Sequence, residues 1–411
     1  MLADALRRPG TVLLDGPRPD ADTGRRGALV FSGPRRTLVA RAPAEVGPVL
    51  DALDRALAGG EHVAGALAYE AGYALHPSVG AAPPAAGRGG PDVPLAWFGV
   101  YGPPRALDAG ALDAALPAGG AAVRDAAFAW GAGAYAERVA AVRAHIRAGD
   151  VYQVNLTAPF RFRLDGDALA LFAALRARQP VSYGAFVRFP GDAGGACVAS
   201  VSPELFFRVD PPRPGDGGVG GAGRTVTARP MKGTAPRGAT PPADRALARA
   251  LAADPKNRAE NLMIVDLLRN DVARVSEPGS VRVPVMFEAE RYATVTQMTS
   301  TVQATLRPGA ALGDVVRALF PCGSVTGAPK IRAMQVIRDL EGGPRGVYCG
   351  AIGYAAPDGT AAFSVPIRTA VVAGGAGRYD VGSGVVWDSV AEAEYAECLL
   401  KARVLTDLAA P

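Results

Sequence analysis

Residues 229–238, Arg-Pro-Met-Lys-Gly-Thr-Ala-Pro-Arg-Gly, place a lysine beside a glycine in a chain that otherwise uses arginine. Of the 44 basic residues only four are lysine: Lys232, Lys256, Lys330 and Lys401. A lysine ammonium can lose its proton when it is desolvated, whereas an arginine guanidinium in effect cannot. Lys232 is therefore a candidate nucleophile, and Gly233 would let a substrate approach the backbone closely. The alternative, from these residues alone, is an ordinary loop lysine.

The composition of the 411-residue chain predicts a folded interior and no membrane span. Apolar residues make up 49% of the chain, and no apolar run of 18 residues occurs. The net charge is +5, but the arginines are scattered among 39 acidic residues, without the basic stripe that nucleic-acid binding requires. The four cysteines are widely spaced, and the N-terminus lacks the apolar core of a signal peptide. We therefore expect a soluble cytoplasmic protein with free thiols that binds neither nucleic acid nor membrane.

The chain divides by composition at about residue 125. Residues 1–125 alternate apolar runs with Gly/Pro-rich breaks, which predicts strands at 11–14, 28–31, 65–69 and 95–101 and a helix at 43–57. The segments 80–94 and 102–120 are predicted connections. We expect an N-terminal β-rich subdomain over 1–125 with a structural role, and a catalytic core over 126–411.

Strand patterns in the middle of the chain carry polar side chains. Gln153 and Asn155 share one face of a strand that starts near residue 151, so they either line a cavity or face solvent. One strand is predicted over 198–209, and it contains Glu204 between apolar neighbours. Apolar surroundings would raise the pKa of this carboxyl and suit it to act as a general acid. The Gly/Pro-rich segment 211–223 that follows is a predicted hairpin end.

Three glutamates in helical patterns are candidate metal ligands. Glu260 lies in a predicted helix over 254–275, away from its apolar side. In a second helix, expected from residue 389, Glu394, Glu397 and Lys401 share one face. Neighbouring carboxylates repel one another unless a cation joins them, and Mg²⁺ with oxygen ligands is the simplest such cation. The alternative is an exposed, charged helix face.

Two further patterns predict contacts to an anion. The Gly/Thr-rich loop at 321–328 runs into a helix, and backbone N–H groups at a helix N-terminus favour anions. The order of residues in a P-loop is absent here. Arg368 is expected in the middle of a strand over 361–372, where a buried guanidinium needs an anionic partner such as a substrate carboxylate.

Taken together, these stretches resemble the chorismate-using enzyme family, which includes anthranilate, aminodeoxychorismate, isochorismate and salicylate synthases. The resemblance is strong from residue 132 to the C-terminus and weak before it. It is carried, in order, by residues 149–156, 202–205, 229–238, 256–271, 321–332, 348–354, 367–369 and 382–401. The resemblance implies an α+β fold in which two large antiparallel sheets are sandwiched between helices and the two sequence parts are intertwined.

The resemblance also implies a role for each candidate residue. Neutral Lys232 would attack C2 of chorismate while Glu204 protonates the departing C4 hydroxyl; ammonia would then add at C4 and expel the lysine. Glu260 and Glu397, helped by Glu394, would hold Mg²⁺, the implied cofactor. The positions that match the family's substrate contacts are Gly233, Thr234, Thr326, Tyr348, Arg368, Gly382, Ser383, Gly384 and Lys401.

Four positions bear on which reaction of the family is implied. Members that add water carry a lysine base where this chain has Gln153, so ammonia is the implied nucleophile. Anthranilate synthases typically have alanine where Lys232 stands, whereas aminodeoxychorismate synthases have lysine. Gln297 replaces a histidine that is linked to aromatising pyruvate loss, and residues 13–16, Leu-Leu-Asp-Gly, differ from the Leu-Leu-Glu-Ser of tryptophan-sensing members. The resemblance is therefore closest to the aminodeoxychorismate synthase branch, which serves 4-aminobenzoate and folate synthesis.

The implied reaction needs ammonia from another protein. No cysteine in a Gly-rich turn with a downstream His-x-Glu, the pattern of an amidotransferase, occurs in the sequence. The resemblance implies a separate glutamine amidotransferase subunit and a downstream aminodeoxychorismate lyase. Two alternatives are an anthranilate synthase component I and a non-catalytic, chorismate-binding regulatory subunit. The presence of Lys232 and Glu204 argues against the second.

Overall fold

The computed structural model describes residues 2–16, 27–81, 91–212, 223–292 and 295–409. The elements of the first half are α1 (Leu2–Arg7), β1 (Thr11–Gly16), β2 (Gly27–Phe31), β3 (Arg36–Ala40), α2 (Pro43–Ala58), β4 (His62–Leu67), α3 (Ala71–Leu75), β5 (Ala96–Tyr101), β6 (Arg105–Leu107), α4 (Ala109–Ala115), β7 (Ala121–Phe128), α5 (Ala132–Arg147), β8 (Gln153–Gly166), α6 (Ala168–Arg178), β9 (Tyr183–Arg188) and β10 (Cys197–Ser202). Those of the second half are β11 (Leu205–Asp210), β12 (Thr225–Arg229), β13 (Met231–Pro236), α7 (Pro241–Ala253), α8 (Pro255–Ala273), β14 (Arg282–Arg291), β15 (Val295–Thr305), α9 (Leu312–Leu319), β16 (Gly327–Ala328), α10 (Lys330–Glu341), β17 (Ala351–Ala355), β18 (Ala361–Ser364), β19 (Thr369–Ala373), β20 (Ala376–Val385) and α11 (Ala391–Thr406).

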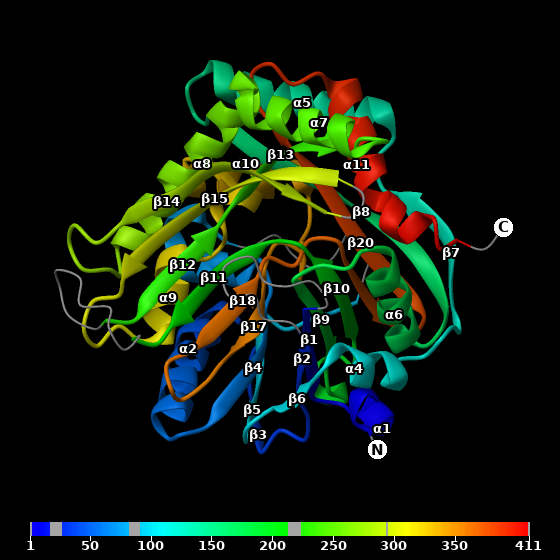
Figure 1. The fold of residues 1–411 in the computed structure, drawn as a ribbon, viewed down its shortest axis with the longest axis vertical. Coiled ribbons are helices and arrows are strands. Elements are labelled where there is room, and N and C mark those ends of the chain that lie inside the picture. Colours follow the sequence, from blue (N-terminus) through cyan, green and yellow to red (C-terminus); the bar gives the residue numbers. More distant parts are fainter. Residues whose placement is uncertain (1, 17–26, 82–90, 213–222, 293–294, 410–411) are drawn as a thin grey trace.

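The strands form two ten-stranded sheets. One has the order β16-β8-β20-β19-β10-β9-β1-β2-β6, with β7 on β8; the other has the order β13-β15-β12-β11-β18-β17-β4-β5-β3, with β14 on β15. The strand pairs described in both sheets are antiparallel, for example β20 on β8 and β17 on β4. A layer of helices that includes α5, α7, α8, α10 and α11 covers one end of the sheets (Figure 1). The expected α+β fold with two large antiparallel sheets is confirmed.

The N-terminal strands are divided between the two sheets. β1, β2, β6 and β7 belong to the first sheet, and β3, β4 and β5 belong to the second. The four strands and the helix predicted before residue 102 are confirmed, with ends that differ by a few residues. The predicted connection at 102–120 instead contains β6 and α4. Helix α4 begins here because Asp108 caps it by accepting a hydrogen bond from the backbone N–H of Ala111. The predicted loops at 80–94 and 211–223 lie largely outside the described residues.

The chain crosses between the sheets at Pro203-Glu204. We expected one strand over 198–209, and this was wrong, since β10 belongs to the first sheet and β11 to the second. Proline has no N–H to donate to a sheet ladder, so Pro203 is a natural place for the strand to break. The crossing places Glu204, with its side chain buried, at the junction of the two sheets.

A second crossing lies beside the first. Arg368 was expected in mid-strand, but it lies between β18 of one sheet and β19 of the other, with φ 53°. The backbone N–H of Val365 donates to the carbonyl of Glu204 (3.1 Å), and the Ser202 hydroxyl donates to the carbonyl of Val365 (2.5 Å). These bonds hold the two crossings together, which brings Glu204 and Arg368 into one region.

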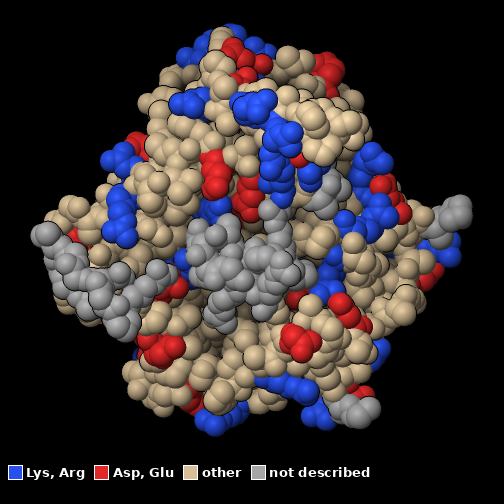
Figure 2. Space-filling view, viewed as in Figure 1, with Lys and Arg blue, Asp and Glu red and all other residues tan. Residues whose placement is uncertain are grey.

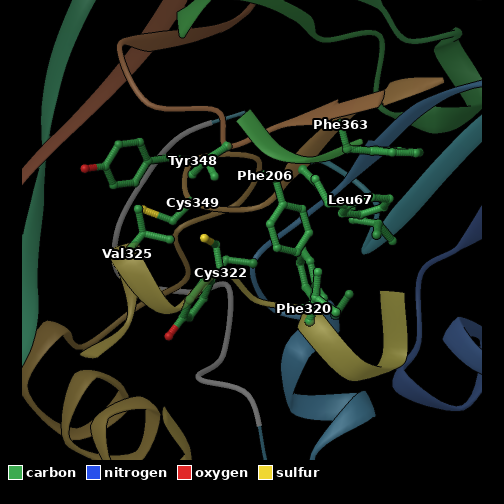
Figure 3. Packing of buried hydrophobic residues seen from close by; sticks show 14 of the residues in the cluster. Leu67, Phe206, Phe320, Cys322, Val325, Tyr348, Cys349 and Phe363 are labelled. Carbon is green, nitrogen blue, oxygen red and sulfur yellow. The ribbon is translucent and has the colours of Figure 1, made fainter. Parts of the chain in front are cut away.

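A hydrophobic cluster packs behind this junction (Figure 3). The rings of Phe206 and Phe320 lie 6.1 Å apart, and those of Phe207 and Phe363 lie 5.1 Å apart. Tyr348 belongs to the same cluster and also lines the candidate site. The cluster therefore gives the junction a rigid apolar support.

The composition also predicted free cysteines and no membrane-spanning segment. All four cysteines are buried and free, as expected. Within the described ranges, every helix is too short or too polar to cross a bilayer.

Candidate active site

A cavity of about 300 Å³ lies at the sheet junction, beneath the helical layer. Its walls come from both sheets, from the two crossings and from helices α8 and α11. The lining residues are Asn155, Glu204, Met231, Lys232, Gly233, Thr234, Lys256, Asn257, Glu260, Gln297, Ser324, Val325, Tyr348, Ile367, Arg368, Tyr379, Asp380, Val381, Gly382, Gly384, Glu394, Glu397 and Lys401. On the face shown in Figure 2, acidic and basic side chains gather close together below the helical layer.

Lys232 projects from β13 into this cavity. Its Nζ lies 3.0 Å from the position that a Cβ at Gly384 would occupy, so the glycine leaves space for the lysine. Nζ forms no hydrogen bond or ion pair with a described residue. Burial lowers the pKa of Lys232, and Lys401 lowers it further, whereas Glu260, Glu204 and Glu397 act in the opposite direction. The net shift favours a neutral amine, which is the nucleophilic form.

Glu204 lies beside Lys232 with its carboxyl group buried. The Ser324 hydroxyl donates a hydrogen bond to Glu204 Oε1 at 2.6 Å. Burial raises the pKa of Glu204 to about 7, although Ser324, Lys232 and Arg368 each lower it. A carboxyl group with this pKa can give up and regain a proton near neutral pH.

The three candidate metal ligands line one side of the cavity. Glu397 Oε1 pairs with Lys401 Nζ at 2.5 Å, and the Ser389 hydroxyl donates to Glu394 Oε1 at 2.7 Å. Burial raises the pKa of Glu260, and repulsion from Glu394 and Glu397 raises it further. Burial acts on Glu397 in the same direction, but the net pKa of Glu397 is lowered, chiefly by Lys401.

These carboxylates fit a divalent cation by their chemistry rather than by a preformed geometry. Among the described residues, no three Asp, Glu, His or Cys side chains are already gathered as metal ligands. The repulsion that raises the pKa of Glu260 is, however, the kind that a bound Mg²⁺ would relieve, and carboxylate oxygens are its preferred protein ligands.

Most of the expected substrate-contact residues line the cavity. These are Gly233, Thr234, Tyr348, Arg368, Gly382, Gly384 and Lys401. Two side chains are directed elsewhere. Ser383 lies on the opposite face of β20 from its neighbours, where its hydroxyl bonds that of Tyr135 (2.8 Å). The Thr326 hydroxyl donates to the carbonyls of Cys322 (3.1 Å) and Gly323 (3.2 Å).

Lys401 has a second contact that fixes its position in the site. Besides Glu397, its Nζ donates to the carbonyl of Gly382 at 2.8 Å. A Cβ at Gly382 would lie 2.5 Å from the carbonyl oxygen of Leu156, so only glycine allows the two strands to approach this closely. Helix α11 is thus tied to the cavity wall formed by β20.

Gln153 and Asn155 were expected either to line a cavity or to face solvent, and both lie in the cavity region. Asn155 lines it directly. Gln153 is buried, and its Nε2 lies 2.6 Å from the position of a Cβ at Gly384, next to Lys232. Neither polar atom of the Gln153 amide has a hydrogen-bond partner among the described residues.

Sequence reasoning missed Ser324 and gave Lys256 no role in the site. Both residues line the cavity, and with Lys256 three of the chain's four lysines line it. The scarcity of lysine was a signal that could have identified Lys256. Ser324 carried little signal, because a serine in a Gly/Thr-rich loop is common. In the 321–328 loop, Ser324 and Val325 line the cavity, whereas no described residue of α10 lines it.

A family comparison agrees with this geometry. The model of the chorismate binding enzyme family matches residues 12–407. The chain belongs to this family. The match covers nearly the whole chain, including both sheets and every candidate site residue.

Relatives in the chorismate-binding enzyme family carry two different names. The chain is 46% identical over 274 residues to aminodeoxychorismate synthase of Streptomyces griseus, covering 67% of this chain and 36% of the relative. It is 42% identical over 275 residues to aminodeoxychorismate synthase component 1 of Klebsiella aerogenes, covering 67% and 57%. Anthranilate synthase component 1 of Streptomyces coelicolor is 42% identical over 271 residues, covering 66% and 50%. The matches thus span from about a third to just over half of these relatives.

Solved structures agree on the fold. Anthranilate synthase component I from Streptococcus pneumoniae TIGR4 superposes with a TM-score of 0.72 at 26% identity, covering 96% of this chain and 90% of that one. A putative isochorismate synthase, DhbC, from Bacillus anthracis has a TM-score of 0.75 at 19% identity, covering 99% of both chains. The family and its fold are therefore clear, and the choice of reaction has to be argued from the residues of the site.

Proposed function

We propose that this chain is an aminodeoxychorismate synthase component I, a transferase that replaces the C4 hydroxyl of chorismate with an amino group to give 4-amino-4-deoxychorismate. The observation that carries the proposal is Lys232. This lysine lies in the cavity without an ion pair to any described residue, its pKa is lowered, and it lies beside a carboxyl group whose pKa is about 7. The relatives named aminodeoxychorismate synthase support the same assignment.

The first half of the reaction uses Lys232 and Glu204 together. The neutral Lys232 amine forms a bond to C2 of the ring, the double bond shifts, and the C4–O bond breaks. Glu204 gives its proton to the departing hydroxyl, which leaves as water. The lowered pKa of Lys232 supplies the free electron pair, and the raised pKa of Glu204 supplies the proton.

The second half returns both residues to their starting states. Ammonia forms a bond to C4, the double bond shifts back, and the C2–N bond breaks with its electrons returning to Lys232. The new ammonium group at C4 gives one proton to the Glu204 carboxylate. The balance is chorismate plus ammonia giving 4-amino-4-deoxychorismate plus water. Covalent capture divides one difficult substitution into two easier ones.

The other charged residues of the cavity bind the substrate in this proposal. Arg368 and Lys401 are suited to pair with the two carboxylates of chorismate. Glu260, Glu394 and Glu397 would hold Mg²⁺, which when bound supplies positive charge beside the ring carboxylate. Gln153 stands at the place from which an added water would otherwise be activated, and an amide is too weak a base for that task.

The proposal implies two other proteins. A glutamine amidotransferase subunit would supply the ammonia, and a separate aminodeoxychorismate lyase would convert the product to 4-aminobenzoate for folate synthesis. Both would work with this chain in the cytoplasm.

The test is to incubate the purified chain with chorismate, Mg²⁺ and ammonium, and to separate the products with and without added lyase. We expect a product that becomes 4-aminobenzoate only when lyase is present. Fluorescent anthranilate formed without lyase would overturn the proposal in favour of the second candidate, anthranilate synthase component I, which the 42% identity to the Streptomyces coelicolor relative favours. No consumption of chorismate would favour a non-catalytic binding protein.

A further inference from the structure

The Glu204 carboxyl group is held by a residue far away in the sequence. Ser324, 120 positions along the chain, donates its hydroxyl hydrogen to Glu204 Oε1 at 2.6 Å. Ser324 is itself 4% exposed and lines the same cavity as Glu204. The contact therefore joins the crossing between the sheets to the loop that precedes α10.

A thiol lies on the other side of the Ser324 hydroxyl group. Cys322 Sγ lies 3.2 Å from Ser324 Oγ. A serine hydroxyl has one hydrogen, and the bond to Glu204 uses it, so the thiol must be the donor to Ser324. Burial raises the pKa of Cys322 to about 12, which keeps the thiol protonated and able to donate. The result is a directed chain from Cys322 to Ser324 to Glu204.

The loop that carries Ser324 is fixed on both sides. The Thr326 hydroxyl closes it through two carbonyls, and Arg345 Nη1 donates to the carbonyl of Val325 at 2.7 Å. Because the backbone on either side is held, the Ser324 hydroxyl has a defined position from which to hold its acceptor. It is a rigid donor, unlike a side chain on a free loop.

The groups facing Glu204 differ in what they can do. Lys232 and Arg368 lower its pKa by their charge, and the backbone N–H of Met231 and the Ser324 hydroxyl do so by hydrogen bonding. Cys322, a further titratable neighbour of Glu204, stays neutral because burial raises the pKa of its thiol. Ser324 is the side-chain hydrogen-bond donor in this set. Its hydroxyl occupies Oε1 of the Glu204 carboxyl group.

We propose that Ser324 is a positioning residue for Glu204: by donating its hydroxyl hydrogen to Oε1, it keeps the exchangeable proton of Glu204 on Oε2. The inference rests on the proposed function, because the proton on Oε2 is the one that Glu204 gives to the C4 hydroxyl and later regains. The covalent steps and their balance are unchanged. Without Ser324, the proton can sit on either oxygen and the carboxyl group can turn.

Two measurements on Ser324→Ala test this inference, with Ser276→Ala as the matched control. Ser276 is also a buried serine, whose hydroxyl donates to the carbonyl of Val272, away from the cavity. In chorismate amination, Ser324→Ala should lower kcat about tenfold with little change in KM, because proton transfer and not binding is affected. In the Glu204→Gln background the same change should have no further effect. Ser276→Ala should match the wild type.

The second measurement does not depend on turnover. The Glu204 carboxyl carbon is followed by ¹³C NMR during a pH titration, with its signal assigned by its loss in Glu204→Gln. Because the Ser324 hydroxyl stabilises the carboxylate, its removal should move the Glu204 titration to higher pH. An unchanged titration, or a kcat loss that persists in the Glu204→Gln background, would overturn the inference. If the wild type consumes no chorismate, the proposed function fails, and the titration alone decides the role of Ser324.

Discussion

Two charged clusters on either side of the cavity wall differ in how their charges are satisfied. Behind the wall, Arg345 and Glu341 form an ion pair at 2.7 Å with both side chains 1% exposed. Arg345 also donates to the carbonyls of Val325 (2.7 Å) and Asn155 (2.6 Å), and Glu341 accepts from the backbone and hydroxyl of Thr157. Every charge there has directed partners, so the cluster holds strands and loop in place.

In front of the wall, Lys232 has charged neighbours but no hydrogen bond or ion pair with a described residue. The difference shows what each cluster is suited to do. A charge with a full set of hydrogen bonds is locked in one protonation state, whereas a desolvated charge without them has a shifted pKa and can react. We therefore expect the Arg345–Glu341 cluster behind the wall to determine stability and Lys232 in front of it to determine activity.

The largest expected effect is the loss of activity in Lys232→Arg. Arginine keeps the positive charge but cannot supply a neutral amine, so chorismate turnover should fall about a thousandfold or more. The melting temperature should change little, because Lys232 makes no bond that holds the fold. The measurement is chorismate consumption beside a thermal melt. Turnover within tenfold of the wild type would show that Lys232 is not the nucleophile.

Glu341→Gln should show the opposite behaviour. It leaves Arg345 as a buried charge without its counter-ion, which destabilises a protein by about 3–5 kcal/mol. Urea unfolding measures this loss. The matched control is Lys232→Met, which removes a desolvated amine that forms no ion pair with a described residue and should leave the free energy of unfolding unchanged or higher. Equal destabilisation by both variants would remove the distinction between the clusters.

The pH dependence of stability should change in Glu204→Gln. The Glu204 carboxyl titrates at about 7 in the folded chain, against an ordinary value of 4.5. The folded state therefore binds the proton more tightly, and the stability that this contributes is lost as pH rises from about 4.5 to 7. The wild type should lose on the order of 2 kcal/mol more than Glu204→Gln across this window. Parallel unfolding curves for the two proteins would contradict the raised pKa.

The smallest expected effect is that of Gly384→Ala. The added Cβ would lie 3.0 Å from Lys232 Nζ and 2.6 Å from Gln153 Nε2, so both flexible side chains must shift slightly. Turnover should fall about tenfold while stability changes little. Gly133→Ala, on helix α5 where a Cβ meets nothing within 4 Å, is the control and should behave as the wild type. A wild-type rate for Gly384→Ala would mean that the position of Lys232 is not critical.

The sequence predicted the elements better than it predicted their connections. Helical and strand patterns located α2, α8, α11 and several strands because amphipathic periodicity is a local property. It could not predict that the run 198–209 divides between two sheets, since both halves are apolar and buried. Pro203 was the available signal, and Pro366 marks the second crossing in the same way.

Prediction of the site had a similar limit. Lys232, Glu204 and the three glutamates were found from residue type and from family resemblance, and the structure brings them to one cavity. That Ser383 and Thr326 are directed away from it depends on strand facing and loop closure, which the motif does not contain. The partnership of Ser324 with Glu204 joins residues 120 apart and needed the fold.

The most direct test of the account is the intact mass of the chain after incubation with chorismate and Mg²⁺ without ammonia, followed by peptide mapping. We predict a covalent adduct on Lys232 with the mass of chorismate less one water, absent in Lys232→Arg and discharged by ammonium. An unmodified Lys232 in a preparation that still forms 4-amino-4-deoxychorismate would contradict the role we assign to this residue.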